Sequence, residues 1–365
     1  MESKLLRELR AISRSTTDRL VWARSMCRQA SHHARQGETT EALGAIGSVR
    51  SEFGNSLEPE VAAWLMLTEG ILKYFSGEAD LGVDRLLRAY AVAAASPNCA
   101  ARPTCAAWLA LYYFNTRHFI QMLEMLRESL QLAAHDDHQA QARASLVVAD
   151  AFHLGGRFDL ARPWYERARQ HATVEGDEPA ISAMLHNVAA FRACNLKLAS
   201  ALGEHAPEEA QRANMEASSA LAYDLAVGTR SFASFLPHVV AQILIVDRKY
   251  QEALATLLKI KVGELPSRAH AVHYVDLATC ALHLSDSTLL EFNLRSAQDA
   301  LTRSTDPDDR VYVCCRLASI FDAIGNEQLA THFHVRAQSE VETYRVAQKE
   351  LVAGLIQMIR DVSGT

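Results

Sequence analysis

The chain of 365 residues contains one compact group of metal-binding residue types, His135-Asp136-Asp137-His138. Imidazole nitrogens and carboxylate oxygens are common ligands of divalent metals. Four adjacent side chains cannot all converge on one ion without ligands from elsewhere, so we expect helix caps and water contacts here and no metal site. The pairs His32/His33 and His332/His334 are weaker candidates, and neighbouring residues such as His32 and His33 point about 100° apart on a helix.

Sequence motifs of common enzymes are not found in the chain. There is no Gly-x-x-x-x-Gly-Lys-Ser/Thr loop for nucleotide phosphates, no Gly-x-Gly-x-x-Gly, no His-Glu-x-x-His and no Gly-x-Ser-x-Gly. We therefore expect that the protein is not an enzyme, with no catalytic residues, no cofactor and no bound metal.

The elements that position the remaining polar residues follow from an internal repeat. A position that is mostly small recurs about every 40 residues, with one longer gap in the middle of the chain. A turn glycine before this position supplies a backbone with positive φ, and the small residue lets the second helix approach the first closely. A second small residue, such as Gly70, precedes the turn. The repeated positions are Ala42, Gly82, Met122, Ala161, Ala253, Leu290 and Ala330.

This pattern resembles the tetratricopeptide repeat, in which small residues and aromatics occupy fixed points of a helix-turn-helix unit. The resemblance covers roughly Ala23 to Ala337, with a period nearer 40 than 34 residues and with Arg117 where a turn glycine belongs. It implies an all-α fold, a right-handed α-solenoid of about eight TPR-like units with a long C-terminal helix. The best matches are Ala149, Phe152, Gly156, Phe158, Ala161, Tyr165 and Ala168, and Leu317, Ala318, Phe321, Gly325, Ala330 and Ala337.

The repeat divides the chain into five segments. We expect an N-terminal helix over 1–20, units one to five over 21–202, an irregular or enlarged unit over 203–232, units six to eight over 233–338, and a C-terminal helix extension over 339–365. The irregular part either bends the superhelix into two lobes or is a surface insertion. The extension is too apolar for a solvated tail, so it caps the array, pairs with a second copy, or leads into an output domain.

Composition narrows the class of partner. A net charge of -6 indicates neither nucleic-acid binding nor attraction to a membrane surface. The seven cysteines lie mostly in apolar helical stretches, which is typical of reduced thiols in a cytoplasmic protein. No run of eighteen apolar residues is present. Ser, Asp and Pro in the segment ending Asp306-Pro307-Asp308-Asp309 are typical of a helix start.

The inner face of such a solenoid is built from the first helix of each unit. The register predicts a concave surface with mixed aromatic, basic and amide side chains, which suits an extended peptide or a partner helix. The predicted binding residues are Arg24, Arg35, Tyr74, Phe75, Phe114, Asn115, Arg143, Asp150, His153, His186, His238, Gln242, Thr279, His283, Tyr312, Ser319 and Asp322.

Two functions agree with this surface. The first is a non-catalytic regulatory protein that binds a peptide or protein partner in its groove, without nucleic acid or membrane. The second is a ligand- or peptide-sensing input module, similar to the helical repeats before diguanylate cyclase domains or in peptide-pheromone receptors, which a homodimer through the C-terminal helix would favour. His153, His186, His238 and His283 further suggest that binding of an acidic ligand changes between pH 5 and 8.

Overall fold

The computed structural model describes residues 3–54, 57–204, 207–231, 236–265, 267–304 and 306–364. The predicted segment ends at residues 1, 232 and 365, and residues 205–206 of the irregular segment, lie outside this part. The described residues form α-helices and two short 3-10 helices. These are α1 (Lys4–Ser15), α2 (Arg19–Gln36), α3 (Thr39–Phe53), α4 (Pro59–Phe75), α5 (Ala79–Ala95), α6 (Arg102–Asn115), α7 (Phe119–Leu132), α8 (His138–Leu154), α9 (Phe158–Glu175), α10 (Glu178–Ala201), α11 (Pro207–Val227), α12 (Leu236–Val246), α13 (Tyr250–Leu257), η1 (Val262–Glu264), η2 (Ser267–Ala269), α14 (His270–His283), α15 (Ser287–Leu301), α16 (Pro307–Ala323) and α17 (Glu327–Ser363).

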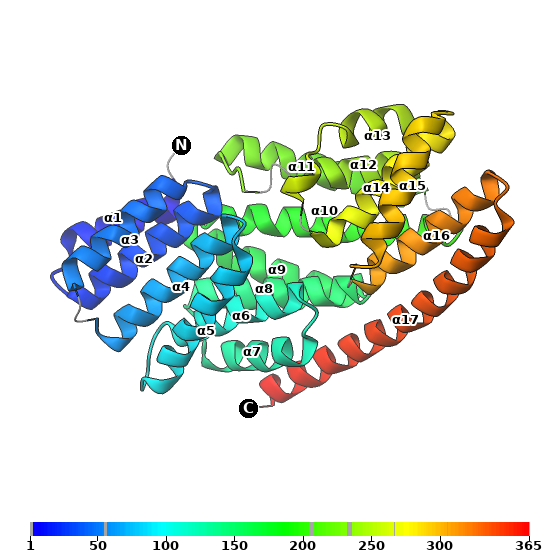
Figure 1. Cartoon of the computed structure of the whole chain (residues 1–365). Helices are drawn as coiled ribbons and strands as arrows, with labels where there is room; N and C mark the ends of the chain where they lie inside the picture. Colours follow the sequence, from blue (N-terminus) through cyan, green and yellow to red (C-terminus); the bar gives the residue numbers. More distant parts are fainter. Residues whose placement is uncertain are drawn as a thin grey trace.

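From α2 onward the helices pack in consecutive pairs, α2 with α3 through to α16 with α17, and successive pairs stack into an all-α solenoid (Figure 1). The small residues of the repeat lie where the paired helices meet. A Cβ atom added to Gly82 would lie 3.0 Å from the carbonyl oxygen of Gly70, so these two helices approach at backbone contact. In the third pair, Arg117 takes the left-handed turn position with φ 62°. A non-glycine residue there is uncommon, and its side chain has a long-range role described below.

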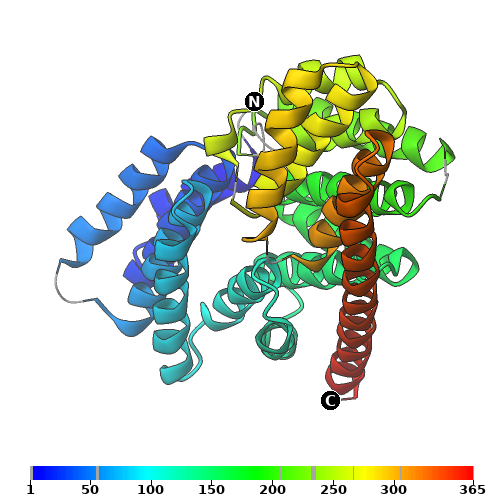
Figure 2. The same cartoon turned by 45° about the vertical axis from the view of Figure 1, so that its right-hand side comes forward.

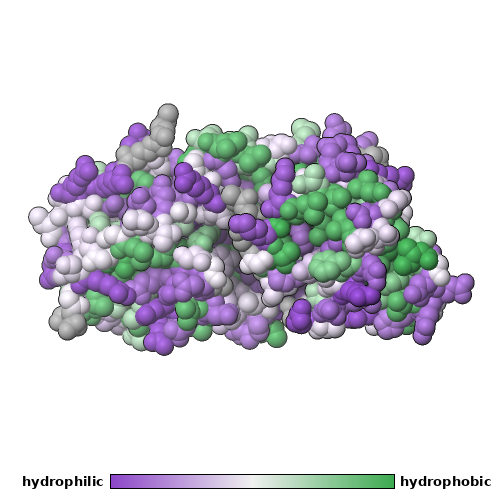
Figure 3. All heavy atoms as spheres, turned by 45° about the horizontal axis from the view of Figure 1, so that its top comes forward, coloured by the Kyte–Doolittle hydropathy of each residue, from purple (hydrophilic) through white to green (hydrophobic). Residues whose placement is uncertain are grey.

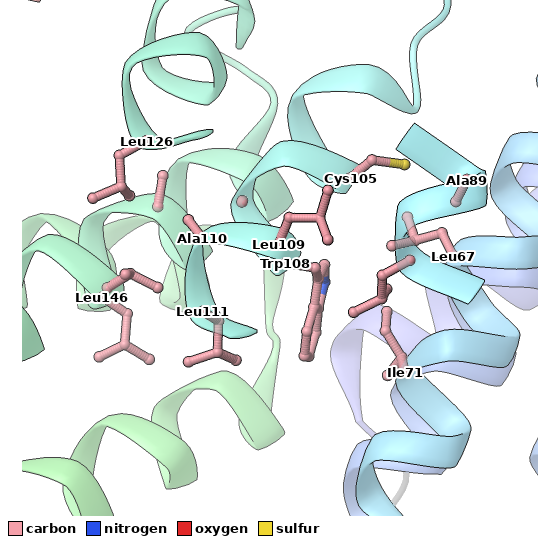
Figure 4. Close-up of a cluster of buried hydrophobic side chains, with 14 of the residues drawn as sticks. Leu67, Ile71, Ala89, Cys105, Trp108, Leu109, Ala110, Leu111, Leu126 and Leu146 are labelled. Atoms are coloured by element: carbon pink, nitrogen blue, oxygen red, sulfur yellow. The ribbon is translucent and has the colours of Figure 1, made fainter. Parts of the chain in front are cut away.

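The seams between pairs are filled by large apolar side chains. Trp108 and Leu109 of α6 lie between α4 and α8, where Leu67 and Ile71 of α4 face Trp108 (Figure 4). All four are buried. One apolar cluster joins α2 to α9, and a second one joins the end of α10 to α14–α17. Burial of these continuous seams stabilises the array, because no single pair can cover both of its faces.

The superhelix turns far enough for the first helix pair to contact the fifth. Nη1 of Arg35 in α2 lies 2.8 Å from both carboxylate oxygens of Asp177, in the turn between α9 and α10. The residues after α11 reach the same helix end, where Ser231 donates to the carbonyl oxygen of Arg35 at 2.6 Å and Thr229 donates to the side chain of Gln36 at 2.7 Å. The irregular middle segment thus connects to the start of the array.

Helix α17 contains 37 residues and is about 55 Å long. Its first half pairs with α16, and its second half crosses to α7 and α8 (Figures 1 and 2). There Leu351, Leu355 and Met358 are buried in the apolar cluster of the first half of the chain. Gln348 also donates to the carbonyl oxygen of Leu154 at 3.0 Å. Three apolar residues of the C-terminal extension, Leu351, Leu355 and Met358, are therefore covered by the chain itself.

None of the helices in the described ranges has the length and apolar character needed to cross a membrane.

Candidate binding groove

A cavity of about 380 Å³ lies at the centre of the solenoid, and we call it the groove. Helix α10 forms its floor through Asn187, Ala190 and Phe191, and its walls come from the C-terminal ends of α4 and α6, from α8 and α12, and from the start of α16. The face of the molecule that carries α11 to α15 is hollowed near its middle (Figure 3). The groove therefore collects residues from helices that are distant in the sequence.

About half of the binding residues predicted from the repeat register line the groove. They are aromatic and polar residues of α4, α6, α8 and α10, together with two residues of α12. These residues come from five consecutive first helices, as expected for the concave face of a solenoid. They are Tyr74, Phe75, Phe114, Asn115, Arg143, Asp150, His186, His238 and Gln242.

Two predicted arginines of the first unit lie elsewhere. Arg35 is buried in its ion pair with Asp177, beside a void of about 10 Å³ that also borders Arg143. Arg24 lines a separate polar cavity of about 610 Å³ together with Trp64 and Asp137. That cavity and the groove share no lining residue.

The other predicted residues contact their own helix or a neighbouring helix and do not line the groove. His153 is buried against Tyr165, with 3.2 Å between Nδ1 and the phenol oxygen. In the last two units none of the predicted residues lines the groove, although His238 and Gln242 of the sixth unit do. Thr279 donates to the carbonyl oxygen of Val275, His283 stacks on Tyr250, Tyr312 donates to Asp276, Ser319 donates to the carbonyl oxygen of Cys315, and Asp322 pairs with His334.

One end of the groove carries an ionic cluster that the repeat pattern does not indicate. Arg117, in the turn after α6, pairs with Asp306 and Asp308 at the start of α16, at 3.4 and 3.2 Å. Lys197 of α10 pairs with Asp309 at 3.0 Å. In the sequence these aspartates are typical helix-start residues, and the only signal for the cluster is Arg117 itself, which replaces a turn glycine.

A second group of polar residues in the groove is less completely paired. Nδ2 of Asn115 donates to the hydroxyl oxygen of Tyr74 at 2.7 Å, and the guanidinium of Arg143 lies 4.1 Å above the ring of Trp108. Asp150 accepts from Tyr165 at 2.9 Å and from Asn187 at 2.6 Å. Burial raises the pKa of Asp150 to about 7, although both hydrogen bonds oppose the shift.

Burial moves the pKa of three of the predicted histidines downwards. Burial lowers the pKa of His153 to about 4 and that of His238 to about 3, and it also lowers the pKa of His283. His153 and His238 are therefore neutral between pH 5 and 8. The carboxyl of Asp150, with its pKa raised to about 7, changes its charge within that window.

The histidine–aspartate segment before α8 has structural contacts. Asp137 accepts from the backbone N–H of Ala140 and caps α8, while Nδ1 of His138 lies 2.9 Å from Nδ1 of His171. Over the described ranges, no three His, Cys, Asp or Glu side chains are close enough together to hold a metal ion.

The chain resembles known proteins in fold. No family model matches it. The crystal structure of a Rap protein complexed with Competence and Sporulation Factor superposes with a TM-score of 0.53 at 13% identity, over 94% of this chain and 98% of that chain. The apo form of RapI superposes with a TM-score of 0.48 at 12% identity, over 94% and 98%. The first similarity shows a shared helical-repeat fold.

Proposed function

We propose that the protein is a non-catalytic, cytoplasmic regulatory protein of the TPR type, with a period near 40 residues, that binds a peptide or an extended protein segment in the groove. The observation that carries this proposal is the groove itself, a central cavity of about 380 Å³ with aromatic walls and amide side chains. Amides can pair with a peptide backbone, and aromatic rings supply contact area at low entropic cost.

The similarity to the Rap protein complex supports the same proposal, because that protein has this fold and its structure was solved with Competence and Sporulation Factor. The ionic residues of the groove also favour binding over catalysis. Lys197, Arg117 and Asp308 are held in ion pairs, so none of them is a free acid, base or nucleophile.

The input-module alternative rests on the 40-residue period and on a last helix that extends beyond its repeat partner. In the structure the second half of α17 packs on α7 and α8, with Leu355 fully buried. The apolar residues Leu351, Leu355 and Met358 are thus already covered, which is why we favour the binding protein.

The proposal is tested by filling the groove. Ala190 lines its floor on α10, whereas Ala91 is exposed on α5. We expect that the full chain captures a peptide or protein partner from the native host, identified by co-purification and mass spectrometry. The Ala190→Trp variant should lose that partner, and the matched Ala91→Trp variant should keep it. The same enrichment with Ala190→Trp as with the wild type would contradict the proposal.

A further inference from the structure

Arg143 on α8 is a buried cation that lines the groove without an anionic partner. Only 7% of its surface is exposed, and among the described residues it makes no ion pair and no hydrogen bond to a side chain. Its guanidinium is supported only by the face of Trp108, at 4.1 Å from the ring centroid. Burying an unpaired charge is costly, so such a residue usually has a counter-charge that is missing from the unliganded protein.

The nearby carboxylates do not supply that counter-charge. Asp177 is within electrostatic range of Arg143, but both of its oxygens are held by Arg35 at 2.8 Å. Asp150 is held by Tyr165 and Asn187. Burial raises the pKa of Asp150 to about 7, so near neutral pH it carries only part of a negative charge. Burial, followed by the charge of Arg35, lowers the pKa of Arg143 to about 10, which still leaves it protonated.

A hydrogen-bond donor lies on the same wall of the groove. The hydroxyl oxygen of Tyr74 accepts from Asn115 at 2.7 Å, so the phenol proton itself is directed elsewhere. Tyr74 and Arg143 line the same cavity and are close enough to influence each other electrostatically. The rings of Phe75 and Phe114 border them. The site thus combines a cation, a neutral donor and an apolar wall, which is the set of groups that binds an organic carboxylate.

We infer that the Arg143–Tyr74 end of the groove is a carboxylate subsite, which receives either the free C-terminus or an Asp or Glu side chain of the bound segment. That the carboxylate belongs to a bound peptide rests on the proposed function. That the subsite binds a carboxylate does not, because a small carboxylic acid can occupy it alone. A guanidinium that faces a ligand carboxylate gives a charge-assisted hydrogen bond, which fixes the direction in which the segment lies along α10.

The first test uses a small probe. N-acetylphenylalanine carries one carboxylate and one ring, and N-acetylphenylalaninamide is its neutral match. We expect ligand-observed NMR with the full chain to show binding of the acid and at least about tenfold weaker binding of the amide. Arg143→Gln should abolish this preference and Arg143→Lys should keep part of it, while Arg24→Gln, in the separate cavity, should leave it unchanged. Thermal melting of each variant checks that it is folded.

The second test identifies the source of the carboxylate in a peptide. Three pools of random heptapeptides are compared by affinity selection: free C-termini without Asp or Glu, amidated C-termini with Asp and Glu, and amidated C-termini without them. Enrichment from the first pool assigns the C-terminus, and enrichment from the second assigns a side chain. Equal enrichment from all three pools, or the same peptides bound by Arg143→Gln, overturns the subsite. If no pool binds the wild type but the acid probe does, the peptide function fails and the subsite stands.

Discussion

We expect that breaking the ion pair between Arg35 and Asp177 lowers the free energy of unfolding more than the loss of most other single contacts. It joins α2 to the turn before α10, and the two side chains are only 5% and 4% exposed. Replacing Arg35 by Met keeps the apolar stem but leaves the Asp177 carboxylate buried without its cation. Breaking a buried pair in this way costs about 3–5 kcal/mol. We therefore expect the Arg35→Met variant to lose about this much free energy of unfolding at pH 7 in urea titrations followed by circular dichroism.

Two further variants separate the charge from the packing. Asp177→Asn retains the cap of α10, because an Asn side chain can also accept from the N–H of Ala180. The double variant Arg35→Met, Asp177→Asn should recover at least half of the loss, since no buried charge remains. The exposed pair Arg295–Glu291 is the control, and Glu291→Gln should change stability by less than about 1 kcal/mol.

The loss should also depend on pH. Burial alone would raise the pKa of Asp177, but the charge of Arg35 outweighs burial and holds the pKa below its usual 3.8. A depressed pKa in the folded state gives stability that is present above pH 3.8 and is lost as the pH falls through the folded-state value. The gap between wild type and Arg35→Met should therefore narrow in acid. A loss below about 1 kcal/mol at pH 7, or no recovery in the double variant, would refute this reasoning.

Three other predictions concern packing and titration. In the same urea titrations, Gly82→Ala should lower the unfolding free energy by about 1–3 kcal/mol, because the added Cβ forces α5 away from α4. Gly44→Ala should raise the unfolding free energy by about 0.5–1 kcal/mol, because a Cβ at Gly44 meets nothing within 4 Å. Burial raises the pKa of Asp150 to about 7, so the stability contributed by its protonated carboxyl is lost as the pH rises from about 4 to 7. Asp150→Asn should flatten this decline of the melting temperature with pH, and an unchanged slope would contradict the prediction. Leu355→Ala should cost about 2–5 kcal/mol and Val346→Ala, which is half-exposed, much less; equal effects would show that α17 does not pack on α7 and α8.

Much of the fold is predictable from the sequence because the repeat is local. A turn glycine and a small residue such as Gly82 act within one helix pair, and the register they define leads to Tyr74, Asn115 and Arg143 on the groove wall. The register still leads to the groove at His238 and Gln242 of α12, but in the last two pairs Thr279 donates within its own helix and Tyr312 donates to Asp276 of α14.

The contacts that close the molecule could not be predicted in the same way. Arg117 pairs with Asp306 and Asp308 across about 190 residues, and Arg35 pairs with Asp177 across 142. Neither ion pair can be predicted from the repeat period, because each depends on how many helix pairs make one turn of the superhelix. The departure from the repeat at Arg117 was the one visible sign that this position has another role.

The path of α17 has a consequence for how the chain folds. An open repeat array behaves as a one-dimensional chain of units, in which the ends fray first and folding can begin anywhere. In this protein the last helix packs on the third and fourth helix pairs. The final third of the array therefore cannot unfold without exposing Leu351, Leu355 and Met358, which are buried in the apolar cluster of the first half of the chain. Nearest-neighbour behaviour is thereby lost, and the contact order rises. The molecule should therefore fold slowly and unfold as one cooperative unit, with its C-terminal amides exchanging as slowly as those in the middle of the chain.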